Sequence, residues 1–180
     1  VNALKPGESI GLDNGETLTV TASDAAGSSI RIDNPGLHLI DRTRTTGARA
    51  AAGAPCALAL NAHGIENIAY RDTGNHLDEI WSDPRGQGTT DLTANAGAPS
   101  AQGNPHTYVD PSGNQVVLIF RGADNHVRSL YWMFGAVGQD NLGGSINAPR
   151  AAGNPAGWLA AHDGVPHVTY RGGNGHLHEI

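Results

Sequence analysis

The sequence has few basic residues, and this shortage excludes two classes of partner. Only 11 of 180 residues are Lys or Arg, the single lysine is Lys5, and the formal net charge is −6. A chain with this balance repels a phosphate backbone and an anionic lipid surface. We therefore expect neither nucleic acid nor an anionic membrane as a partner.

Cysteine and long apolar runs are also scarce. The lone Cys56 cannot form an internal disulfide, and its apolar context APCALAL favours a packed thiol. No apolar run approaches the length of a membrane span, and no amino-terminal signal region is visible, so we expect no membrane insertion. The compartment stays open: a secreted or cell-surface protein, a fragment and a cytosolic protein all fit.

Glycine and proline, in contrast, are abundant. Together they make 35 of 180 residues, while charged residues make only 16%. This composition favours many short strands joined by tight turns over helices. Alanine clusters with Gly and Pro at 48–55, 96–105 and 148–155, and we interpret these stretches as loops because Gly and Pro at that density disfavour a helix.

The chain repeats itself at a step of 50 residues without any gap. An aromatic residue followed by an arginine recurs, and a histidine lies five residues after each of these arginines. These positions are Tyr70-Arg71, Phe120-Arg121 and Tyr170-Arg171, with His76, His126 and His176. Prolines recur at the same step at Pro55, Pro105 and Pro155. Periodicity in this range indicates a solenoid, a propeller or another repeat array.

Each repeat has the strand content of one propeller blade. In the unit 54–103 we expect strands at 56–60, 66–71 and 76–81, and a fourth at 89–93. In the next unit we expect strands at 116–121, 126–134 and 140–142. In the last unit we expect strands at 166–171 and 176–180. The segment VVLIF (116–120) is apolar throughout, so we expect both of its faces to be covered.

We therefore predict an all-β fold, a β-propeller forming a single domain over 1–180 with units 4–53, 54–103, 104–153 and 154–180. The first unit is degenerate and the last lacks its outer strand. Four blades could close a ring. Alternatively, two chains associate as a homodimer to close a seven- or eight-bladed ring, or the chain is part of a longer one.

At YRDTGNHLDEIW, FRGADNHVRSLYW and YRGGNGHLHEI the chain resembles bacterial propeller lectins of the Photorhabdus lectin type. The resemblance covers roughly residues 54–180. It implies a multivalent agglutinin that binds fucose or O-methylated sugars in pockets between blades. Tryptophan is sparse in this sequence, and the first unit lacks the motif.

Two groups of residues could bind a sugar. The repeated Arg and His either bracket the hairpin turn or present donors to sugar hydroxyls. Aromatic residues either pack in the core or form platforms for the C–H face of a sugar. We expect direct contact from Glu79, Trp81, Tyr131 and Trp132. The full set of candidate ligand-binding residues is Arg71, His76, Glu79, Trp81, Tyr108, Arg121, His126, Tyr131, Trp132, Trp158, Arg171, His176 and Glu179.

We expect no metal, no cofactor and no catalysis. His176 and His178 share a strand face beside Glu179, but two histidines without a visible third ligand are a weak zinc pattern. The acids are scattered, and no nucleophile or phosphate-loop motif is present. The main hypothesis is a carbohydrate-binding lectin whose partners are glycans. The alternatives are a non-catalytic scaffold module of a larger enzyme or toxin, and a hydrolase with two carboxylates in one cleft.

Overall fold

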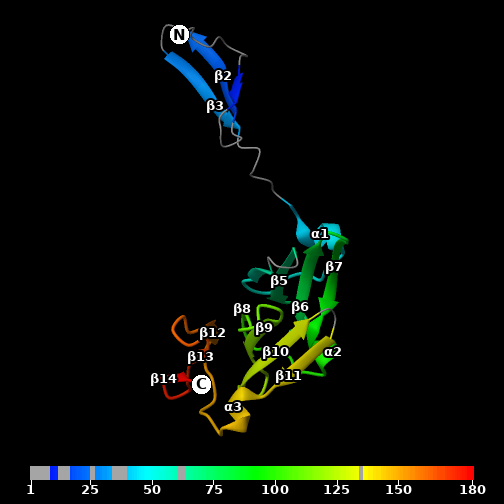
Figure 1. The fold of residues 1–180 in the computed structure, drawn as a ribbon, viewed down its shortest axis with the longest axis vertical. Helices are drawn as coiled ribbons and strands as arrows, with labels where there is room; N and C mark the ends of the chain where they lie inside the picture. The colour runs from blue at the N-terminus through cyan, green and yellow to red at the C-terminus, as the bar shows by residue number, and fades with distance from the viewer. Residues whose placement is uncertain (1–8, 12–16, 25–26, 34–39, 61–63, 134–135) are drawn as a thin grey trace. The chain divides into compact units, whose positions relative to one another are not determined.

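The computed structural model describes residues 9–11, 17–24, 27–33, 40–60, 64–133 and 136–180 (Figure 1). It divides into two compact units, Val1–Asp41 and Arg42–Ile180. No helix in the described ranges is long and apolar enough to cross a membrane. The amino-terminal unit contains a three-stranded antiparallel sheet of β1 (Ser9–Gly11), β2 (Thr17–Asp24) and β3 (Gly27–Asp33), in that order. Part of the predicted first blade, including 34–39, lies outside the described residues.

The second unit contains three antiparallel sheets in which neighbouring strands follow one another along the chain. The first sheet consists of β4 (Cys56–Leu60), β5 (Ile65–Arg71), β6 (Leu77–Asp83) and β7 (Gly86–Asp91). The second consists of β8 (His106–Val109), β9 (Val116–Arg121), β10 (Val127–Met133) and β11 (Ala136–Asp140). The third has β12 (Ala156–Leu159), β13 (Pro166–Arg171) and β14 (Leu177–Glu179). The expected all-β class is confirmed, and the strand β9 coincides with the predicted 116–121.

Among the described residues, three helices of about one turn lie just before the Ala/Gly/Pro stretches. They are α1 (Arg42–Thr46), α2 (Leu92–Ala96) and α3 (Leu142–Ser145). Within the residues described, the stretches themselves contain no helix apart from Ala96 at the end of α2. The predicted strand 89–93 instead ends at Asp91, because its side chain accepts a hydrogen bond from the backbone N–H of Ala94 and so caps α2. Gly97, in the left-handed region at φ 60°, ends that helix.

The three sheets of the second unit share contacts at positions 50 residues apart. Each repeated arginine donates from Nη2 to a backbone carbonyl of the incoming loop, at Ala52, Gln102 and Ala152 respectively. An isolated bridge next to each contact joins Ala51 to Asp72, Ala101 to Gly122 and Ala151 to Gly172. The first strands β4, β8 and β12 lie next to one another in order. The matched arginines and the matched bridges thus occupy equivalent surroundings in the three sheets.

The core consists of two layers, one on each face of the middle sheet. Val116, Leu118 and Phe120 of β9 pack with Trp132 against the β4–β7 sheet. Val117 and Ile119, on the opposite face, pack against the β12–β14 sheet. All five of these apolar side chains of β9 are buried, as the uninterrupted apolar run predicted.

Gly157 on β12 packs closely against side chains of the second sheet. A Cβ at this position would lie 2.9 Å from Ile119 Cγ1 and 2.9 Å from Tyr108 Cε1. We expect Gly157→Ala to lower the free energy of unfolding by about 1–3 kcal/mol, because the packed sheets must separate. Urea unfolding of this variant should be compared with Gly173→Ala, where a Cβ would lie 4.0 Å from the backbone oxygen of Arg150. Equal stability of the two variants would contradict the packing argument.

Candidate functional site

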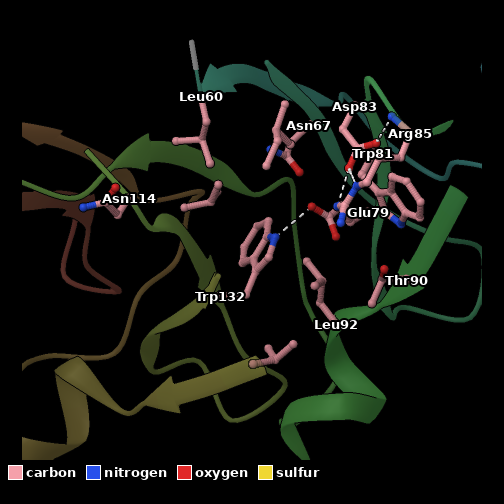
Figure 2. Close-up of a pocket in the computed structure, with 13 residues that line it drawn as sticks. Leu60, Asn67, Glu79, Trp81, Asp83, Arg85, Thr90, Leu92, Asn114 and Trp132 are labelled. Atoms are coloured by element: carbon pink, nitrogen blue, oxygen red, sulfur yellow. Dashed lines mark hydrogen bonds and ion pairs between the residues drawn. The ribbon is translucent and has the colours of Figure 1, made fainter. Parts of the chain in front are cut away.

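A cavity of about 290 Å³ lies between the β4–β7 and β8–β11 sheets (Figure 2). We call it the inter-sheet pocket. Three of the four residues expected to contact a sugar line it: Glu79, Trp81 and Trp132. The remaining lining residues are Leu60, Ile65, Asn67, Asp83, Arg85, Thr90, Leu92, Asn114, Val116 and Val137.

The strand alternation of β6 places Glu79 and Trp81 on the face that looks toward the next sheet. These residues pair in register with Ala69 of β5 and Gly88 of β7, respectively. Gly88 lets the indole of Trp81 lie flat on β7, since a Cβ there would come within 2.6 Å of the ring. Gly138 has the same relation to Tyr131 on the next sheet. Gly88 thus lets Trp81 form a platform at the wall of the inter-sheet pocket, and Gly138 and Tyr131 repeat this arrangement in a separate hollow of the second sheet.

Glu79 is the central polar group of the pocket. Only 4% of the residue is exposed, and its Oε1 accepts a hydrogen bond of 2.7 Å from the Trp132 indole Nε1 (Figure 2). Burial raises the pKa of Glu79 from 4.5 to about 7, although hydrogen bonds from Trp132 and Thr90 oppose the shift. The carboxyl group is thus oriented, poorly hydrated and able to accept further hydrogen bonds.

A second carboxylate, Asp83, lines the pocket, but both of its oxygens accept hydrogen bonds within its own turn. Its Oδ2 accepts from Arg85 Nε at 3.0 Å, and its Oδ1 accepts from the backbone N–H groups of Arg85 and Gly86. The Arg85 side chain lowers the pKa of Asp83. Asp83 therefore fixes the position of Arg85, whose side chain is mostly exposed.

Asn67 of β5 was missed as a candidate from sequence. It is only 3% exposed and lines the pocket, and its Nδ2 has no hydrogen-bond partner among the described residues. An asparagine within the apolar strand IENIAY is a recognisable signal, because β5 otherwise buries apolar groups toward the next sheet. The 50-residue repeat does not reveal Asn67, because the residues at the matching positions of the other units are Val117 and His167.

The repeated arginines lie in the hairpin turns, outside the inter-sheet pocket. Arg71 and Arg121 donate from Nη1 to Asn75 and Asn125, whose φ angles are 66° and 61°. Together with their carbonyl contacts, these bonds agree with the structural interpretation in which arginine brackets the turn. A ligand-binding role for Arg71, Arg121 and Arg171 stays a prediction.

The repeated histidines have three different surroundings. His76 Nδ1 lies 2.8 Å from Asp91 Oδ2, and His176 stacks near His178 with ring centroids 6.4 Å apart. His126 Nδ1 is buried and unpaired within the part of the chain that the structure describes. None of the three lines the inter-sheet pocket. In the described ranges, no group of three His, Cys, Asp or Glu could hold a metal ion.

A separate charge cluster joins the loop after α1 to the first sheet of the second unit. Arg49 Nη1 lies 3.2 Å from Asp72, 3.3 Å from Asp78 and 2.8 Å from Asp91. Burial raises the pKa of Asp78 to about 6 despite the nearby Arg49. His76 belongs to this cluster through Asp91, and a ligand-binding role for His76 stays a prediction.

The remaining predicted residues lie on the later sheets. Tyr108 and Tyr131 line a shallower hollow on the face of the second sheet that looks toward the third. Trp158 is 39% exposed and stacks on His167 with ring centroids 5.5 Å apart, and His167 Nδ1 lies 2.9 Å from Glu179 Oε1. These residues form groupings separate from the inter-sheet pocket.

No protein-family model and no curated protein matches the chain. Among solved structures it is similar to a fucose lectin from Kordia zhangzhouensis in complex with methyl-fucoside. Identity is 18%, the match covers 70% of this chain and 90% of that chain, and the TM-score is 0.49. A triple arginine-to-alanine mutant of AofleA from Arthrobotrys oligospora is 13% identical, covering 95% of this chain and 48% of that chain, also with a TM-score of 0.49.

Proposed function

We propose that the protein is a carbohydrate-binding lectin and that the inter-sheet pocket binds one neutral sugar ring. The observation that supports this most is the buried Glu79 carboxyl between Trp81 and Trp132. Sugars present hydroxyl groups beside apolar C–H faces, and sites that bind them combine hydrogen-bonding groups with aromatic walls. A cavity of about 290 Å³ has the size of a site for a small molecule.

The apolar part of the pocket favours a deoxy or O-methylated sugar. Leu60, Val116 and Val137 line it together with the polar groups. A methyl substituent buried against such side chains gains about 0.8 kcal/mol for each buried carbon. Fucose carries a methyl group on its ring, and O-methyl sugars carry one on oxygen, so both classes implied by the resemblance suit this lining.

We also propose that the sheets are blades of a propeller and that sugar sites recur between them. The ordered contacts of β4, β8 and β12 suit a radial arrangement with first strands innermost. Several sites on one ring would raise avidity for a glycan surface without new contacts. The number of blades, and with it a homodimer, stays a prediction that the mass in solution from light scattering would decide.

Two alternatives fit the pocket less well. A scaffold module would bury its tryptophans, whereas Trp81 is partly exposed in a cavity beside Glu79 and Arg85. A glycoside hydrolase needs two working carboxylates. Glu79 and Asp83 both line the pocket, but Asp83 accepts hydrogen bonds within its own turn at both oxygens.

Titration with methyl α-L-fucoside, followed by the indole 1H–15N signals of the three tryptophans, tests the proposed function. We expect the signals of Trp81 and Trp132 to shift with saturation, because their rings line the pocket. Trp158 lies outside the inter-sheet pocket, and its signal reports whether a further site on the third sheet binds the sugar. A glycan array would extend the search to O-methylated sugars. Absence of binding on the array, together with unmoved Trp81 and Trp132 signals at high ligand concentration, would refute the proposal.

A further inference from the structure

The unpaired amide of Asn67 is the polar feature of the inter-sheet pocket that packing does not explain. The residue is buried, its Nδ2 lacks a hydrogen-bond partner within the described residues, and it lines the cavity. Buried amides are normally paired, and leaving one unpaired costs stability. The presence of this unpaired amide is explained if a bound ligand supplies the missing hydrogen-bond acceptor.

Asn67 and Glu79 lie close together on one face of the β4–β7 sheet. Asn67 pairs in register with Trp81, and Glu79 pairs with Ala69, so the two side chains are diagonal neighbours across β5 and β6. Nδ2 can only donate, and Glu79 can only accept when it is ionised, above its pKa of about 7. The binding measurements are therefore made above that pH. The pocket therefore offers one donor and one acceptor to two neighbouring oxygens of a ligand.

Asn67 and Glu79 have matched positions 50 and 100 residues further along the chain, where the carboxylate is lost on the second sheet and kept on the third. Val117 and Ser129 replace them on the second sheet, where the amide and the carboxylate are both lost. His167 and Glu179 replace them on the third, where Nδ1 lies 2.9 Å from Oε1 and Nε2 is buried without a partner among the residues described. A side-chain donor at the Asn67 position and a carboxylate at the Glu79 position thus occur together on the first and third sheets and are both absent from the second, as expected when two groups serve one ligand.

We infer that Asn67 is the specificity-determining residue of the pocket and that it selects a neutral pyranoside bearing an ether oxygen beside a free hydroxyl. This inference rests on the proposed sugar-binding function. An ether oxygen, either an O-methyl group or the ring oxygen, can accept from Nδ2 but cannot donate to Glu79. Methylation of the hydroxyl at Glu79 therefore removes a hydrogen bond, whereas methylation of the oxygen at Asn67 preserves one.

Affinities for methyl α-L-fucoside and its 2-O-, 3-O- and 4-O-methyl ethers, measured by calorimetry, test the inference. The variants N67V and N67H introduce the residues of matched positions 117 and 167. In the wild type we expect at least one ether to bind within about threefold of the parent and at least one to bind about tenfold more weakly. N67V should weaken the parent and the tolerated ether about tenfold, and N67H should restore most of that loss because imidazole can donate.

The outcomes separate this inference from the function on which it rests. Thermal unfolding of N67V at or above the wild-type temperature would show that lost binding is not lost folding. If E79Q abolishes binding while N67V keeps the wild-type affinities, the role of Asn67 is refuted and the lectin function stands. Uniform weakening of all ethers in the wild type also refutes the selection by Asn67. If the wild type binds none of the four ligands, both the site and the inference fail for this sugar series.

Discussion

Replacing Glu79 by glutamine should lower the affinity of the inter-sheet pocket for a sugar by about 10- to 100-fold. Hydrogen bonds to a charged group contribute about 1.5–3 kcal/mol, and each 1.4 kcal/mol changes affinity tenfold. Glutamine keeps the shape of the side chain and can still accept from Trp132 Nε1, which bonds Glu79 at 2.7 Å. The variant therefore removes the charge without emptying the pocket. Calorimetric titration with methyl α-L-fucoside measures the loss.

The same substitution should stabilise the fold above neutral pH. The pKa of Glu79 is raised to about 7 in the folded protein from 4.5, so the folded state holds a proton that the unfolded state has lost between these values. Wild-type stability consequently falls as the pH rises from 4.5 to 7, by about 3 kcal/mol in total. A glutamine side chain does not titrate, so it does not contribute this dependence of stability on pH. The melting temperature of E79Q should exceed that of the wild type at pH 8 and approach it at pH 5.

Two comparisons isolate this effect. The pKa of Asp78 is raised to about 6, which makes the stability of both proteins depend on pH to the same extent. The difference in melting temperature between the two proteins therefore reports Glu79. Glu66→Gln removes an exposed carboxylate from the same sheet, paired to Arg42 at 3.6 Å, and should leave both affinity and stability nearly unchanged. Unchanged sugar affinity in E79Q, or a melting difference that does not depend on pH, would contradict the role assigned to this carboxyl group.

Local patterns in the sequence predict the strands well because the period of two and the turn residues are local signals. The apolar run at 116–120 predicted a strand covered on both faces, and β9 is buried on both. The predicted fourth strand at 89–93 was wrong at its end, since Asp91 begins a helix there by accepting from Ala94. A capping residue that follows a strand directly is easily mistaken for its continuation.

The pocket is harder to predict because its walls come from two sheets. Glu79 and Trp81 share a strand face, which the alternation of β6 shows, but the approach of Trp132 depends on packing between sheets. Repetition draws attention to the arginines at 71, 121 and 171, which lie outside this pocket and donate to backbone carbonyls of the incoming loops. Asn67, in contrast, lacks a matching residue in the other repeats, and its importance emerges only from its burial and its unpaired amide.

Replacing Phe120 by alanine should give the largest loss of stability, about 3–5 kcal/mol. The ring is fully buried in the layer between the β4–β7 and β8–β11 sheets, together with Leu118 and Trp132. Since whole domains are stable by only about 5–15 kcal/mol, this change alone would remove a large part of the stability. All three tryptophans belong to the unit Arg42–Ile180, so fluorescence during urea unfolding reports that unit without the amino-terminal sheet.

Ile119→Ala is the matched variant on the opposite face of the same strand. Ile119 is also fully buried, but it packs toward the β12–β14 sheet, and its loss should cost about 2–5 kcal/mol. Because Trp132 packs in the layer of Phe120, only Phe120→Ala should also shift the Trp132 indole signal and weaken sugar binding at moderate temperature. If the two variants perturb Trp132 and the pocket equally, the two faces of β9 do not act as separate layers, and the radial stacking of independent sheets is wrong.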